Sequence, residues 1–139
     1  MATYNKYLSA VKPMLEGINS ATDTYKIALC LTVNGATDTT FVAGTYDLAT
    51  AGGYTAGGNA ATYVSAVNTA GTYKLILNSP TMWTATGSGF TFRYAVLYDS
   101  TTNNLVGYWD YGSNVVMSGA NSDTFTVTLD ATNGVFQAT

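Results

Sequence analysis

The sequence predicts an all-β fold: an antiparallel β-sandwich or jelly roll with one short N-terminal helix. Apolar and polar residues alternate with a period of two along most of the chain, Gly and Asn residues separate these stretches, and a helix-like spacing is confined to the N-terminus. A length of 139 residues suits one domain. We therefore predict a single β domain over 1–139, with a helix at 3–18, a β-sandwich at 24–139 and a long Gly-rich loop at 37–59.

The N-terminal residues carry the pattern of an amphipathic helix. Its apolar residues recur at spacings of four, three, four and three: Tyr4, Leu8, Val11, Leu15 and Ile18. Pro13 interrupts the pattern, because it lacks a backbone donor and clashes with the preceding turn. The predicted helix therefore kinks there or ends near Lys12, and it either covers the open end of the β core or docks on a partner.

Strands are predicted wherever the period-two alternation is sustained. The segments are 25–33, 72–78, 90–98, 105–111, 123–129 and 135–138, with a weaker candidate at 62–67. Asn34-Gly35 and Asn133-Gly134 are typical turn sequences between them. The inward-facing set is predicted to be Ile27, Leu29, Leu31, Leu75, Leu77, Phe92, Tyr94, Val96, Trp109, Phe125, Val127 and Leu129.

The segment 37–59 differs from the rest because it is rich in Gly and shows no sustained alternation. Long loops in compact domains are usually functional or disordered, and the aromatic residues here argue against disorder, since each must pack on something. Tyrosine also supplies large contact area at protein interfaces, although core filling is its alternative role. The candidate interface residues are Tyr4, Tyr7, Phe41, Tyr46, Tyr54 and Tyr63.

Composition speaks against catalysis. The chain has no His and a single Cys, Cys30, so the commonest general base, a disulfide framework and a cysteine metal cluster are all missing. The carboxylates are scattered singly, as expected of turn and cap residues. Charged residues make up 9% of the chain, the net charge is −3, and no apolar run approaches membrane-spanning length. We expect no enzyme activity, cofactor or metal, and neither nucleic acid nor membrane as a partner.

An ordered set of segments resembles a group of small phage virion structural proteins. After the N-terminal helix come TYKIAL at 24–29, GYTAGG at 53–58, a lone Trp83, FRYAVLYD at 92–99, LVGYWDYG at 105–112, and FTV at 125–127 followed by Gly134. The resemblance spans nearly the whole chain. Independently of it, Gly53 and Gly57-Gly58 permit positive φ around a buried Tyr54, and Arg93 is placed to pair with Asp110 or Asp99.

The resemblance implies a non-enzymatic virion component of the capsid decoration (cement), head-fibre or tail-component type, with no catalytic residue to carry over. We favour a decoration protein that stabilises the head and is made in the bacterial host cytoplasm. Its partners would be the phage major capsid protein or other virion proteins, and it would form a homo-oligomer, a dimer or trimer. The alternative is a fibre or tail recognition module that binds host surface glycans through exposed tyrosines.

Overall fold

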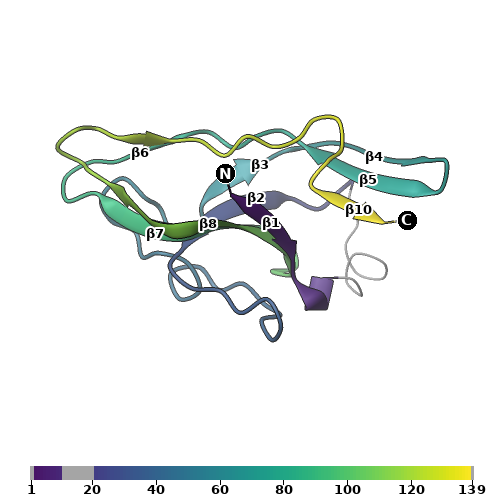
Figure 1. Ribbon diagram of the computed structural model, residues 1–139, viewed down its shortest axis with the longest axis horizontal. Coiled ribbons are helices and arrows are strands. Elements are labelled where there is room, and N and C mark those ends of the chain that lie inside the picture. The colour runs from purple at the N-terminus through teal and green to yellow at the C-terminus, as the bar shows by residue number, and fades with distance from the viewer. Residues whose placement is uncertain (1, 11–20, 139) are drawn as a thin grey trace.

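The computed structural model describes residues 2–10 and 21–138 (Figure 1). These residues form an all-β fold with antiparallel sheets, as the alternation predicts, and no α-helix occurs among them. The largest sheet has five strands in the order β1-β8-β7-β2-β3. Their bounds are β1 (Thr3–Lys6), β2 (Tyr25–Cys30), β3 (Asn59–Ala61), β7 (Phe90–Asp99) and β8 (Leu105–Met117).

A second sheet has three strands in the order β10-β5-β4. Its bounds are β4 (Tyr63–Thr69), β5 (Thr72–Leu77) and β10 (Phe136–Ala138). The short strands β6 (Trp83–Thr84) and β9 (Thr124–Phe125) pair with each other. Figure 1 shows β4, β5 and β10 as a layer above the five-stranded sheet, with the β4–β5 hairpin reaching toward one end of the molecule.

The first hydrophobic core lies between these two layers. Ile27 and Leu29 of β2 and Leu75 and Leu77 of β5 belong to one buried cluster, to which Phe92 of β7 also contributes. Val127 and Leu129 complete it from the segment that follows β9. These seven residues are buried as the alternation predicts.

A second core covers the opposite face of the five-stranded sheet. Ala28 and Cys30 of β2 are fully buried there, and Phe41 stacks on Tyr98 with ring centroids 3.7 Å apart. Because this sheet is covered on both faces, the inner strands carry buried residues at consecutive positions. The small side chains on β2 leave room for the aromatic rings that cover them.

An irregularity in β7 changes which side chains share a face. Phe92 pairs with Val115 of β8, whereas Tyr94 pairs with Asp110, so the register shifts between them. A β-bulge of this kind moves the following side chains to the other face. Val96 is therefore buried in the second core and not beside Phe92 as predicted.

Four other residues of the predicted core are not fully buried. Leu31 is 46% exposed, because β2 already ends at Cys30, so its placement in the core is wrong. Tyr94, Trp109 and Phe125 are partly buried at the borders of the two cores. The weaker strand candidate at 62–67 is confirmed, since this segment forms most of the strand β4.

The predicted helix over 3–18 is wrong where the structure describes it. Thr3–Lys6 is the edge strand β1, and Leu8–Ala10 is a short 3-10 turn, η1. β1 forms because Tyr4 pairs across the sheet with Trp109, ring centroids 5.1 Å apart, and its hydroxyl lies over the Cα of Gly107, where a larger residue would clash. The rest of the predicted helix, 11–18, lies outside the described residues.

Replacing Phe92 by Ala tests this register. Phe92 has no exposed surface, and emptying such a site costs about 3–5 kcal/mol of unfolding free energy. Val116→Ala is the control, because Val116 is 71% exposed, and we expect a change within about 0.5 kcal/mol. Urea denaturation of both variants measures the difference, and equal losses would contradict the assigned register.

Candidate functional site

The long loop between β2 and β3 is organised around the buried carboxylate of Asp47. Its Oδ1 accepts a hydrogen bond from the Gly44 amide at 2.6 Å, and its Oδ2 accepts one from the Gly57 amide at 2.7 Å. The Tyr54 hydroxyl also donates to Oδ2. Three donors from separate parts of the loop therefore meet one carboxylate, which joins the loop into a single unit.

Tyr54 connects this loop to the sheet. Its hydroxyl oxygen accepts a hydrogen bond from the Leu29 amide of β2 at 3.1 Å. Burial, and next the hydrogen bond to Asp47, raise the pKa of Tyr54 far above its ordinary value. Gly53 and Gly58 adopt φ angles of +97° and +70°, and a Cβ at either would collide with backbone of a neighbouring segment. The prediction of positive φ around a buried Tyr54 is confirmed.

A second hydrogen-bond chain ties the N-terminal segment to the same loop. Tyr46 donates its hydroxyl proton to Asp38 at 2.6 Å, so the Tyr7 hydroxyl, 2.7 Å from that of Tyr46, donates to Tyr46. Asp38 also accepts from the Asn34 amide at 2.6 Å. Burial and the bond to Tyr46 raise the pKa of Tyr7, so this phenol stays protonated.

The six aromatic candidates for an interface are thus separated by the fold. Tyr7, Phe41 and Tyr54 are buried, where they build the second core or hold the loop. Tyr4, Tyr46 and Tyr63 keep part of their surface exposed. An interface role for the six stays a prediction, but within the folded chain only the second three offer surface to a partner. The sequence signal for this burial lies in β2, where the small residues Ala28 and Cys30 at alternate positions leave room for aromatic rings over that face of the sheet.

The remaining Asp side chains act mainly as loop and turn residues, as predicted. Backbone amides donate to these carboxylates: Asn34 to Asp38, Thr101 to Asp99, Gly112 to Asp110, Ser118 to Asp123 and Thr132 to Asp130. Asp110 also forms a two-pronged pair with Arg93, at 2.9 and 3.0 Å, which lowers its pKa and confirms one of the two predicted partners. Within the described part of the chain, no three such ligands gather around a metal position.

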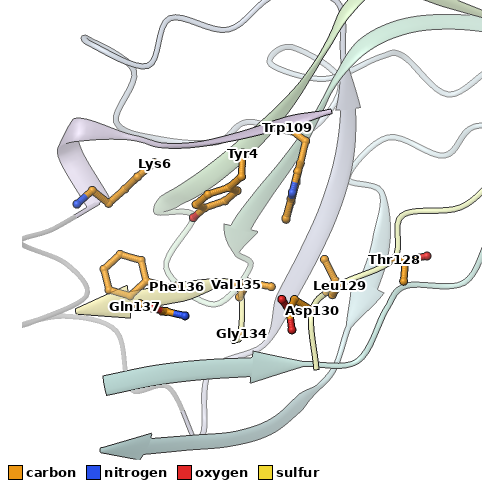
Figure 2. Close-up of a pocket in the computed structure, with 10 residues that line it drawn as sticks. All are labelled: Tyr4, Lys6, Trp109, Thr128, Leu129, Asp130, Gly134, Val135, Phe136 and Gln137. Carbon is orange, nitrogen blue, oxygen red and sulfur yellow. The ribbon is translucent and has the colours of Figure 1, made fainter. Parts of the chain in front are cut away.

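A groove of about 550 Å³ lies between β1 and β10 (Figure 2). Aromatic rings and polar groups share its lining: Tyr4, Lys6, Trp109, Asp130, Phe136 and Gln137. β1 is an edge of the five-stranded sheet and β10 an edge of the three-stranded sheet, so the groove follows the open side between the two layers. Neither the alternation nor the turn signals predict this groove, because its walls β1 and β10 come from opposite ends of the chain.

The edge strand β4 is the other conspicuous surface. It has seven residues, none of them charged, whereas the edge strands β1, β3 and β10 have only three or four. Val64 and Val67 are about half exposed on it. Long uncharged edges are where another chain pairs most readily.

Comparisons with known proteins add no relative: the chain matches no protein-family model, no curated protein and no solved structure. In the part of the chain that the structure describes, no helix has the length and apolar character needed to cross a membrane.

Tyr54→Phe tests the hydrogen bonds that hold the loop. The ring stays in place, but Asp47 loses a donor and the Leu29 amide loses its acceptor, which costs about 1–3 kcal/mol of unfolding free energy. Tyr63→Phe removes the same atom from a hydroxyl with no hydrogen-bond partner among the described residues, and should change stability by less than about 0.5 kcal/mol. Urea titration of the two variants gives the comparison; an unchanged Tyr54→Phe would contradict the assigned role.

Proposed function

We propose that this chain is a non-enzymatic phage virion structural protein, and specifically a capsid decoration protein that stabilises the head. In this proposal, the five-stranded and three-stranded sheets act as the two layers of a β-sandwich scaffold. The observation that carries it is the long, uncharged β4 edge with its exposed valines. The ordered segments that resemble phage virion proteins supply the context in which that edge would be used.

The β4 edge is suited to a protein partner. An edge strand presents unpaired backbone donors and acceptors, and natural proteins usually shield a long one with charges. β4 has no charged residue, and Val64 and Val67 on this strand are about half exposed. A strand or apolar surface of the phage major capsid protein, or of a second copy in a dimer or trimer, would satisfy these groups.

Stabilisation of the head would follow from mass action. A protein that binds only the assembled shell lowers the free energy of that shell by RT ln(1 + [L]/Kd) at each site. With five basic and eight acidic residues in the whole sequence, few ion pairs would cross the interface. Exposed pairs contribute only about 0–1 kcal/mol each, so apolar contact and backbone pairing would provide the affinity.

The add-back experiment tests this proposal. Particles are stripped of the protein and re-loaded with wild type, Val64→Lys or Val116→Lys. Both valines are exposed, but only Val64 lies on the β4 edge, so a charge there should weaken rebinding about tenfold or more, while the control rebinds normally. Raising the salt concentration should release little wild-type protein.

Two results would overturn the proposal. Equal rebinding of both variants would remove the β4 edge as the contact. Location of the chain on tail tips, together with glycan-dependent attachment to cells, would instead support the fibre or tail recognition module.

A further inference from the structure

The groove between β1 and β10 has a mixed lining that calls for a ligand of matching character. Tyr4 and Trp109 project into it from the five-stranded sheet, and Phe136 faces them from β10 (Figure 2). Thr128, Lys6, Asp130 and Gln137 add polar atoms around these rings. Ligand sites in proteins are typically concave, with aromatic walls and a few polar groups that fix orientation.

The lining of the groove contains one positive and one negative side chain, Lys6 and Asp130. Lys6 places its ammonium 6.0 Å from the centre of the Phe136 ring, so it reaches across from β1 toward β10. Within the described residues Lys6 has no ion-pair partner. Asp130 lies on the other wall, and hydrogen bonds from the Asn133 amide and side chain lower the pKa of its carboxyl group. One cation and one carboxylate give no net preference for a charged ligand, but both can bond to hydroxyl groups.

Hydrogen-bond donors and acceptors without a partner among the described residues also remain at the rim of the groove. Gln137 uses its Nε2 to donate to the Asn133 carbonyl at 2.7 Å, which leaves its side-chain oxygen as an acceptor. The ammonium of Lys6 has three donors to offer. The groove therefore combines aromatic rings with hydrogen-bond donors and acceptors along its lining.

We infer that this groove binds a short, uncharged oligosaccharide. A pyranose ring has apolar C–H faces, which suit the rings of Trp109 and Tyr4, and hydroxyl edges, which suit Lys6, Asp130 and Gln137. The volume of about 550 Å³ lies within the usual range of ligand sites, about 300–1,000 Å³. The inference concerns the isolated chain and does not depend on its place in a virion.

Titration of the ¹⁵N-labelled full chain, followed by NMR, tests the inference. The probes are cellotetraose, chitotetraose and mannotetraose, with tetragalacturonate as an anionic comparison. The chain has two Trp residues, and their indole signals serve as reporter and internal control. Trp109 lines the groove, whereas the Trp83 indole nitrogen is buried in the first core. We expect a saturable shift of the Trp109 signal with at least one neutral probe and no shift of Trp83.

A double variant, Lys6→Ala with Gln137→Ala, checks the residues assigned to the rim. Both side chains are exposed, so the fold should persist, as an unchanged dispersion of the spectrum would show. Affinity for the neutral probe should fall about tenfold or more. Trp109→Ala should abolish the binding. No shift with any neutral probe, unchanged affinity in the double variant, or tighter binding of tetragalacturonate would each overturn the inference.

Discussion

The carboxylate of Asp47 is the interaction on which the rest of the structure depends. A buried carboxylate is costly unless it is well hydrogen-bonded, and Asp47 meets this requirement with two backbone amides and the Tyr54 hydroxyl. Tyr54 in turn accepts from the Leu29 amide, so the loop is fixed to β2. The loop also reaches the second core, because the Tyr98 hydroxyl donates to the Gly57 carbonyl at 2.8 Å and the Gly57 amide donates to Asp47.

This constraint also explains how the aromatic residues are distributed. The five-stranded sheet is buried on both faces, so the chain has to fill two cores. Three of the residues predicted at an interface are therefore buried inside: Tyr7, Phe41 and Tyr54. The surfaces left for partners lie elsewhere. They are the uncharged edge of β4 and the groove beside β1 and β10, which lie on separate strand edges.

Much of the fold could be predicted from the sequence, because alternation reports directly on which strand faces are buried. It found β2, β5 and β7 and the inward Leu29 and Leu75. The positive φ angles around Tyr54 were predicted from the glycines themselves. Prediction from the sequence failed at three kinds of place. The bulge after Phe92 moves the following side chains to the other face of the sheet without any signal in the composition. The spacing of four between Tyr4 and Leu8 fits a strand followed by a turn as well as it fits a helix. The groove joins residues that are far apart in the sequence.

Hydrogen exchange at the Gly57 amide tests the role of Asp47 most directly. Loop amides outside regular strands usually exchange quickly, whereas this amide is buried and donates to Asp47 at 2.7 Å. NMR should show it protected in the wild type, and Asp47→Asn should speed its exchange roughly tenfold or more, since hydrogen bonds to charged groups contribute about 1.5–3 kcal/mol. Amides of β8 serve as the internal reference. Exchange of Gly57 at the rate of an unfolded chain in the wild type, or an unchanged rate in Asp47→Asn, would contradict the central role of this carboxylate.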